Sequence, residues 1–176
     1  YGLMVNSGSS ANLMGFLSLK LRKRSKVITP ALTFSTTVSP IVQSGLIPLF
    51  IDVDRNTLQI NTKILKKIDL ENVSAICVPN LVGNVANWEE INNFAEENKL
   101  KIIEDSADTI GYSYKTALSN WSDVSTTSFY ASHVITGAGF GGMTCFNDKE
   151  AYEHALSLRG WGRRSSLYSH SEDYER

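Results

Sequence analysis

Hydrophobic and polar positions fall into two alternating kinds of segment along the chain. In residues 88–100 (WEEINNFAEENKL) apolar side chains recur every three or four positions, which is the spacing of one helix face. Asn87 precedes this segment and Glu90 follows three residues later, a pattern typical of a helix start. The same periodicity predicts helices over 10–22, 36–44, 61–67 and 149–159. Short apolar runs beside breakers predict strands over 26–30, 46–53, 74–80, 101–106, 124–130 and 142–146.

The order of these segments predicts the fold class. Strands and helices alternate at the spacing of βαβ units, which predicts an α/β protein with a mostly parallel sheet and helices on both faces. Ligands of such sheets bind beyond the carboxyl ends of the strands. Polar residues that directly follow strands are therefore the first candidates for a functional site.

Composition narrows the classes of function. The 176 residues carry 17 Lys and Arg against 18 Asp and Glu, so no overall positive charge favours nucleic acid as a partner. The basic run 19–26 is interpreted as the solvated end of a helix. No apolar stretch has the length of a membrane span, and the first residues lack a signal-peptide pattern. Cys77 and Cys145 are too few for a disulfide scaffold, so we expect two core cysteines in a cytoplasmic protein.

The first candidate for chemistry is NSGSSAN (6–12), directly before a predicted helix. Gly8 allows an anion to approach the backbone, Ser9 and Ser10 supply hydroxyls, and a helix N-terminus offers free N–H groups. The segment suits a phosphate group. A serine N-cap on a glycine turn is an equally good interpretation of the same residues.

The second candidate is IIEDSAD (102–108), where Glu104 and Asp105 end a predicted strand and Asp108 follows. A carboxylate at a strand end can hold a cationic ring nitrogen, coordinate a metal or cap the next helix. No histidine or cysteine stands nearby at ligand spacing, so we expect no metal site here.

The third candidate is TTSFYASHVITGAGFGG (126–142), with Ser128 at a strand end and His133 five residues later. A histidine at that place suits a general base at neutral pH, although a lone histidine is more often structural. The glycine-rich stretch lacks the strand, tight turn and helix of a dinucleotide site.

Taken together and in order, these motifs resemble a known family. The resemblance to the DegT/StrS-type (DegT/DnrJ/EryC/StrS) enzymes rests on NSGSSAN (6–12), ALTFSTTV (31–38), IIEDSADTIG (102–111), SFYASH (128–133), GFGGM (139–143) and RGWGRR (159–164). Members of this family are pyridoxal-phosphate enzymes of fold type I that act on nucleotide-linked sugars. The resemblance implies that residues 1–176 are the cofactor-binding large domain of a homodimeric protein, with the C-terminal small domain outside this chain.

The resemblance also assigns the residues that bind the cofactor phosphate. Gly8, Ser9 and Ser10 match the glycine–serine turn of the family, and Ser128 matches a second phosphate ligand.

Three further residues match positions around the pyridine ring. Asp105 corresponds to the carboxylate that keeps the ring nitrogen protonated and so preserves the cofactor as an electron sink. Phe34 corresponds to the aromatic side chain that stacks on the ring, and Asp108 lies on the side of its hydroxyl group.

One departure from the transaminase pattern decides the expected reaction. Where transaminases of the family carry the aldimine lysine, this chain has His133, and no lysine occurs between Lys115 and Lys149. The segment SFYASH is similar to the SFYPAH motif of the family's sugar 3-dehydratases. We therefore expect a 4-keto-6-deoxyhexose 3-dehydratase that binds pyridoxamine or pyridoxal 5′-phosphate non-covalently and uses His133 to move protons.

Two alternatives remain. The protein is a nucleotide-sugar aminotransferase that works without the usual lysine, or it is an inactive relative that serves as a binding partner. Retention of Asp105 and Ser128 argues against the inactive relative. No cysteine follows Arg164, which disfavours the dehydratases that add an iron–sulfur cluster.

One segment departs from the family pattern, and the role of a second segment has two interpretations. Phe140 stands where the family usually has an acidic residue between glycines, so no acid role is carried over. Trp161, Arg163 and Arg164 either contact a phosphate or carboxylate of the substrate or form a basic helix end at the surface.

Overall fold

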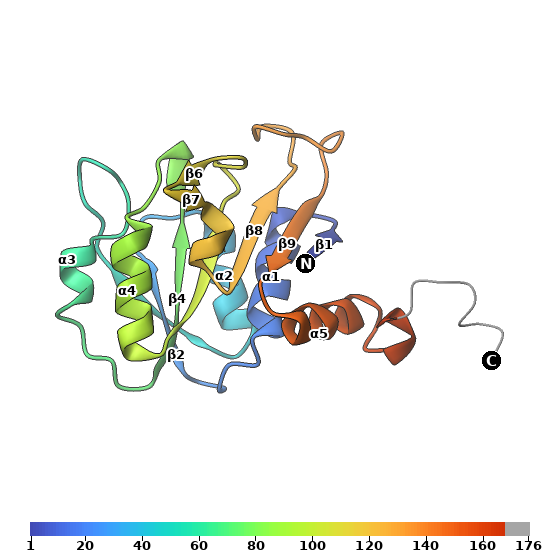
Figure 1. The fold of residues 1–176 in the computed structure, drawn as a ribbon, viewed down its shortest axis with the longest axis horizontal. Coiled ribbons are helices and arrows are strands. Elements are labelled where there is room, and N and C mark those ends of the chain that lie inside the picture. Colours follow the sequence, from blue (N-terminus) through green and yellow to red (C-terminus); the bar gives the residue numbers. More distant parts are fainter. Residues whose placement is uncertain (168–176) are drawn as a thin grey trace.

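A seven-stranded sheet forms the centre of the computed structural model, which describes residues 1–167 (Figure 1). The strand order is β1-β9-β8-β5-β4-β2-β3. The strands are β1 (Gly2–Val5), β2 (Lys26–Pro30), β3 (Ile47–Ile51), β4 (Val73–Pro79), β5 (Lys101–Asp105), β8 (Val124–Ser128) and β9 (Gly142–Phe146). A separate two-stranded hairpin consists of β6 (Ser113–Tyr114) and β7 (Thr116–Ala117).

The sheet is mixed, with parallel pairing predominant. The pairs β2–β3, β2–β4, β4–β5 and β5–β8 are parallel, whereas β9 runs antiparallel to both β8 and β1. The prediction of a mostly parallel sheet is therefore confirmed. The edge strand β1 was not among the predicted strands, and its partner β9 lies about 140 residues further along the chain.

Helices cover both faces of the sheet, as predicted. They are α1 (Gly8–Ser18), α2 (Ser35–Gln43), α3 (Thr62–Leu65), α4 (Trp88–Asn98) and α5 (Lys149–Arg159), with 3₁₀ turns η1 (Leu81–Gly83), η2 (Leu118–Trp121) and η3 (Arg164–Leu167). The predicted cap of α4 is confirmed, because Asn87 Oδ1 accepts a hydrogen bond from the Glu90 amide. The helix α1 ends at Ser18, so the basic run 19–26 follows the helix instead of forming its end. Residues 22–24 of this run are exposed, whereas Ser25 is buried and Lys26 begins β2.

The core has a layer on each face of the sheet. Ile76 on β4 packs in one layer with Trp88 of α4, while its neighbour Cys77 packs in the other layer with Phe16 of α1. This alternation follows from the pleat of a strand, which turns successive side chains to opposite faces. Both cysteines are free thiols. Cys77 is buried, as expected for a core cysteine, whereas Cys145 is only partly buried.

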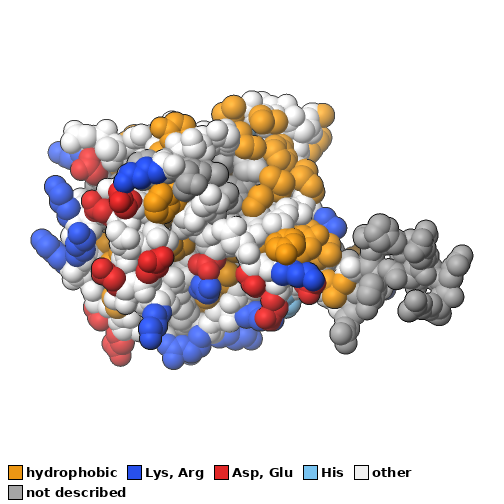
Figure 2. Space-filling model, viewed as in Figure 1, with side chains coloured by type: hydrophobic (Ala, Val, Ile, Leu, Met, Phe, Trp, Pro, Cys, Tyr) orange, Lys and Arg blue, Asp and Glu red, His pale blue; other side chains and the backbone are white. Residues whose placement is uncertain are grey.

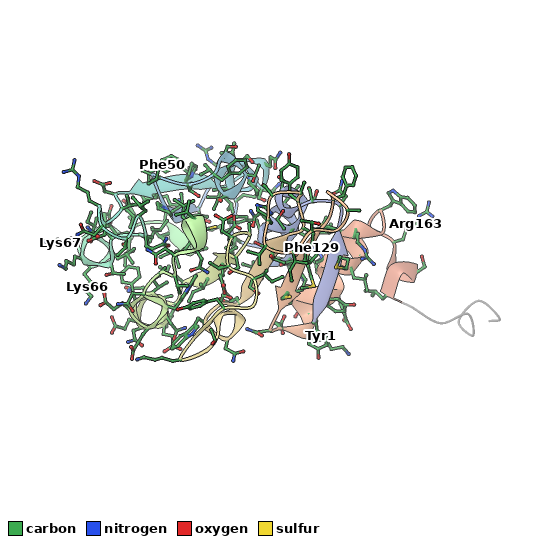
Figure 3. All side chains as sticks on the ribbon, turned by 90° about the horizontal axis from the view of Figure 1, so that it is seen from above. Tyr1, Phe50, Lys66, Lys67, Phe129 and Arg163 are labelled. Atoms are coloured by element: carbon green, nitrogen blue, oxygen red, sulfur yellow. The ribbon has the colours of Figure 1, made fainter. Side chains whose placement is uncertain are left out.

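The molecule is elongated along the direction in which the strands succeed one another. Seen from above, Lys66 and Lys67 lie at one end and Arg163 at the other, with Phe129 between them (Figure 3). Hydrophobic side chains gather over β8, β9 and the loop that joins them (Figure 2). The exposed apolar residues of this loop are Tyr130, Val134, Ile135 and Phe140. Among residues 1–167 no helix has both the length and the apolar character to cross a membrane.

Candidate active site at the carboxyl ends of the strands

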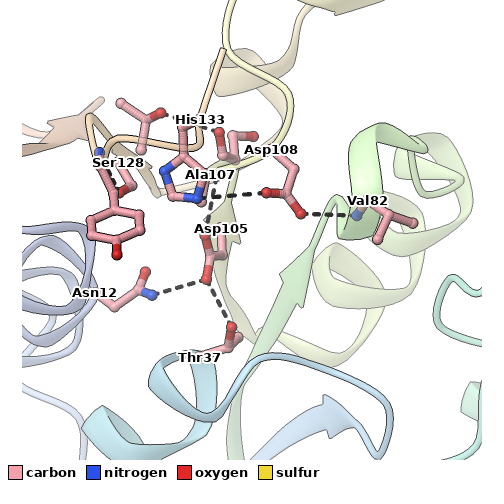
Figure 4. A network of polar contacts seen from close by, with 11 residues as sticks. Asn12, Thr37, Val82, Asp105, Ala107, Asp108, Ser128 and His133 are labelled. Atoms are coloured by element: carbon pink, nitrogen blue, oxygen red, sulfur yellow. Dashed lines mark hydrogen bonds and ion pairs between the residues drawn. The ribbon is translucent and has the colours of Figure 1, made fainter. Parts of the chain in front are cut away.

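Asp105 is the last residue of β5, and its carboxylate is buried and held by three donors (Figure 4). Its Oδ2 atom accepts hydrogen bonds from Asn12 Nδ2 at 2.9 Å and from Thr37 Oγ1 at 2.8 Å. Within the described part of the chain, its Oδ1 atom accepts one bond, from the Ala107 amide at 3.2 Å. Since a carboxylate oxygen can accept two bonds, Oδ1 has capacity for one further donor.

The two side-chain donors to Asp105 come from two different helices. Asn12 is in α1, and its own Oδ1 accepts a bond from Thr126 Oγ1 of β8 at 2.5 Å. Thr37 is in the first turn of α2. The sequence analysis did not single out Asn12 or Thr37, although both lie inside the motifs NSGSSAN and ALTFSTTV. Their position inside those motifs was the only sign in the sequence that they belong to the site.

The turn before α1 and the end of β8 lie against each other. A Cβ atom on Gly8 would come within 2.6 Å of Ser128 Cβ, so only glycine fits there without a shift. Ser128 is buried, and its Oγ accepts a bond from the Tyr130 amide at 3.3 Å. The same close approach continues at Gly142, where a Cβ would lie 2.3 Å from the carbonyl oxygen of Ser7. Three segments that are far apart in the sequence thus meet at the N-terminus of α1.

The serines of this turn have different environments. Ser7 is the N-cap of α1, and its Oγ accepts a bond from the Ser10 amide at 3.1 Å. The Ser7 hydroxyl also donates to Ser10 Oγ at 3.1 Å, which ties the Ser10 hydroxyl to the cap. Ser9 is exposed and Gly8 is partly exposed. The free amides and positive dipole end of α1 suit an anionic group.

Phe34 lies immediately before α2 and is 68% exposed. Its carbonyl oxygen accepts a bond from the Thr37 amide at 3.0 Å, so Phe34 stands one turn from the residue that binds Asp105. An exposed aromatic ring at this place is free to cover the face of a flat ligand.

His133 lies in the loop after β8, and its imidazole is close to Asp108 (Figure 4). Its Nε2 atom is 3.8 Å from Asp108 Oδ1, and its Nδ1 atom is buried with no hydrogen-bond partner among residues 1–167. The ring of Tyr130 meets the imidazole edge-on, with 6.1 Å between the ring centroids. An imidazole can both accept and donate a proton, which suits acid–base chemistry at this place.

Glu104 precedes Asp105 but belongs to a different network. The pleat of β5 turns its side chain to the other face of the sheet, where Asn80 Nδ2 donates to it at 3.2 Å and the hydroxyls of Ser106 and Ser122 also donate. Burial raises the pKa of Glu104 to about 7 despite these donors. The paired carboxylates seen in the sequence are thus separated by the fold.

The described side chains together favour one kind of ligand. A carboxylate with a free acceptor position suits a protonated ring nitrogen, and the α1 N-terminus with Ser128 suits a phosphate. The structure brings Asp105, Asp108 and His133 together at the carboxyl ends of the strands. Phe34 and the Gly8 turn lie on neighbouring elements.

Comparison with known proteins gives one family over almost the whole chain. The profile of the DegT/DnrJ/EryC1/StrS aminotransferase family matches residues 1–173. A dTDP-4-dehydro-2,6-dideoxy-D-glucose 3-dehydratase of Saccharopolyspora spinosa is 38% identical over 169 residues, which cover 91% of this chain and 36% of that protein. A GDP-4-keto-6-deoxy-D-mannose 3-dehydratase of Escherichia coli O55:H7 is 35% identical over 173 residues, covering 93% of this chain and 44% of that protein. The chain therefore spans less than half the length of these curated relatives.

Solved structures give the same fold. The structure of the E. coli GDP-4-keto-6-deoxy-D-mannose-3-dehydratase with bound hydrated PLP superimposes with a TM-score of 0.90 at 33% identity. The superposition covers 96% of this chain and 45% of that chain. The fold class expected from the sequence is thus confirmed.

Proposed function

This chain belongs to the DegT/DnrJ/EryC1/StrS aminotransferase family, and on that premise we propose that it is the large domain of a nucleotide-sugar 3-dehydratase. The proposed reaction removes the C3 hydroxyl of a nucleotide-linked 4-keto-6-deoxyhexose in deoxysugar or polysaccharide biosynthesis. The observation that carries the proposal is His133, whose buried Nδ1 has no partner at the position where the resemblance expects lysine. The names of the two 3-dehydratase relatives support it.

The residues of the site fit pyridoxamine or pyridoxal 5′-phosphate bound non-covalently. Asp105 would hold the ring nitrogen through its free Oδ1 position, because Oδ2 is already occupied by two donors. Phe34 would cover the ring face. When bound, the cofactor supplies an electron sink for the departure of the hydroxyl.

The phosphate of the cofactor would lie at the start of α1. The closeness of Gly8 to Ser128 leaves the helix amides and a buried hydroxyl on one small surface, with the exposed Ser9 beside it. Ser10 would contribute mainly through its backbone, since its hydroxyl is engaged with Ser7. These groups would bind and orient the cofactor without a covalent bond to the protein.

His133 would act as the acid and base of the reaction. Its imidazole accepts a proton from the reacting complex and then donates a proton to the departing hydroxyl, so one group serves both transfers. Asp105 would keep the ring nitrogen of the bound cofactor protonated during these transfers. A histidine can perform both steps and cannot compete for the cofactor through a covalent bond.

The proposed function also implies a longer protein and a dimer. Residues 1–176 would be the cofactor-binding domain of a longer cytoplasmic protein, because the relatives are more than twice as long as the matched segment. A homodimer is part of the same proposal, and the exposed side chains of Phe34 and Phe140 would suit cover by a second copy.

A nucleotide-sugar aminotransferase is the second candidate, favoured by the name of the matched family. The two reactions give different products from the same substrate. The complete protein is incubated with pyridoxamine phosphate, glutamate and a nucleotide-linked 4-keto-6-deoxyhexose, and the sugar product is weighed by mass spectrometry. Loss of the C3 oxygen supports the dehydratase, and replacement of the keto oxygen by an amine supports the aminotransferase. Cofactor binding without either product would point to an inactive relative.

The variant His133→Lys tests the role of His133 directly. We expect it to lose deoxygenation and to gain a cofactor adduct that borohydride traps, because lysine supplies the missing amine. His154→Lys on α5 is the matched control and should keep the activity of the parent protein. An unchanged dehydration rate in His133→Lys would overturn the assignment.

A further inference from the structure

Asp108 connects two loops that meet beside the proposed site. Its Oδ2 atom accepts a hydrogen bond from the Val82 amide at 2.9 Å, and its Oδ1 atom faces His133 Nε2 at 3.8 Å (Figure 4). One loop follows β4 and the other follows β8, so the two residues that Asp108 joins are 51 positions apart. The carboxylate therefore has one oxygen for each loop.

The contact with Val82 fixes the orientation of the carboxylate. Val82 has a φ of +51°, which a β-branched residue rarely adopts, and this conformation directs its N–H at Asp108. Gln59 Nε2 donates to the neighbouring Leu81 carbonyl at 3.2 Å, which ties down the same turn. Since Oδ2 is committed to Val82, Oδ1 is the oxygen left for the imidazole.

The imidazole is held in turn so that its two nitrogens differ. The His133 amide donates to the Tyr130 carbonyl at 3.0 Å, and the Tyr130 ring packs against the imidazole edge. Nε2 faces the Asp108 carboxylate, whereas Nδ1 is buried without a partner. A neutral imidazole carries one N–H and one lone pair, and a neighbouring carboxylate favours the N–H on its own side.

We propose that Asp108 is a positioning residue for His133: its carboxylate keeps the proton of the neutral imidazole on Nε2, the nitrogen that faces it. The identity of the reaction rests on the proposed function, but the position of the proton on the ring is a property of the protein alone. Asp108 acts through His133 and touches no reacting atom in this role.

The isosteric change Asp108→Asn tests the proposal because its effect has a defined direction. An asparagine has one oxygen, and the Val82 amide needs that oxygen as acceptor. The asparagine NH₂ group would then face Nε2 and donate to it, so the proton of the neutral ring should move to Nδ1. A residue with a purely structural role would weaken the loop without exchanging the two ring nitrogens.

The measurement is a long-range ¹H–¹⁵N spectrum of the complete protein labelled in its histidine rings, at pH about 8.5, where an ordinary imidazole is neutral. The parent protein should show a protonated Nε2 and an unprotonated Nδ1 for His133, and Asp108→Asn should show the reverse. The variant His133→Gln identifies the signals, and His154 in the same spectra serves as the unaffected reference. A protonated Nδ1 in the parent protein, or an unchanged pattern in Asp108→Asn, would overturn the proposal.

Kinetics separate this proposal from the proposed function. If the protein is a dehydratase, Asp108→Asn should lower kcat by about 100-fold, because the proton of the neutral imidazole would then lie on the other ring nitrogen. Val82→Gly, which keeps the amide and removes the strained side chain, should leave both the ring pattern and kcat unchanged. If no dehydration occurs at all, the proposed function fails, and the ring spectra still decide the role of Asp108.

Discussion

At the scale of single residues, Asp105 shows how the site is assembled before any ligand enters. Asn12 and Thr37 bind one of its oxygens, and the Ala107 amide binds the other. Because the donors come from α1, α2 and the turn after β5, three elements fix one carboxylate. Because this carboxylate is already held in place, it loses little conformational entropy when a cationic group binds.

Gly8→Ala tests how closely the α1 turn approaches β8. The added Cβ would lie 2.6 Å from Ser128 Cβ, so either Ser128 or the start of α1 must shift. We expect a loss of stability of about 1–3 kcal/mol, typical of overpacking, and weaker binding of pyridoxamine phosphate. Thermal unfolding with and without the cofactor measures both effects.

Gly2→Ala is the matched control, because its Cβ would meet only Met143 Sδ at an ordinary 3.5 Å. Its melting temperature and cofactor response should equal those of the parent protein. Equal behaviour of Gly8→Ala and Gly2→Ala would show that the approach of Gly8 to Ser128 is looser than described.

At the scale of elements, hydrophobic periodicity predicted most helices and strands, but it missed the edge strand β1 and the turn η1. The strand 26–30 and the helix 149–159 were predicted with their observed bounds, because breakers or caps delimit them. The strand β1 was missed because GLMV is too short to show a period, and its partner β9 is remote in sequence. The turn η1 was missed as well, since its conformation depends on Asp108, which lies 26 residues from Val82.

The sequence predicted the site residues that lie in recognisable motifs, but not the contacts between those motifs. Asp105 and Ser128 stand at strand ends, so the rule for α/β sheets located them. The separation of Glu104 from Asp105 is a consequence of the strand pleat, which the sequence analysis did not apply to this pair. The bond from Thr37 to Asp105 joins residues 68 positions apart and has no signature in the sequence.

The strand β5 carries a pH dependence through Glu104. Burial raises its pKa from 4.5 to about 7, so the folded protein keeps a proton that the unfolded chain releases at lower pH. Stability should therefore fall as the pH rises from about 4.5 to about 7, by up to about 3 kcal/mol from this group. Above pH 7 the contribution should be constant, because the carboxyl is then ionised in both states.

Glu104→Gln isolates this contribution. The amide is neutral at every pH and can still bond to its neighbours, so the fall in melting temperature between pH 5 and pH 8 should flatten, by roughly the amount that such a pKa shift implies. Glu97→Gln, at an exposed position of α4, is the control and should keep the full slope. The expectation fails if the melting temperatures of Glu104→Gln and of the parent protein fall equally between pH 5 and pH 8.

At the scale of the whole molecule, the central sheet is packed between two core layers, one on each face. Cys77 lies in the interior strand β4 and is completely buried, in the layer beneath α1 and α2. Burial raises the pKa of its thiol well above the ordinary value, and the nearby Asp105 carboxylate raises it further. The reactive thiolate therefore forms at Cys77 only when the molecule opens.

Labelling of Cys77 by a disulfide reagent should consequently report the opening of the entire sheet. In a Cys145→Ser background at neutral pH, we expect a rate at least about 1,000-fold below that of free cysteine, because a stable domain is rarely unfolded. Urea should raise the rate in parallel with the loss of helical signal, since both follow the same unfolding. The Cys77→Ser variant retains the partly buried Cys145 and should react faster under native conditions. Rapid labelling of Cys77 without urea, with the helical signal intact, would mean that α1 and α2 separate from the sheet on their own, and with them Asn12 and Thr37 from Asp105.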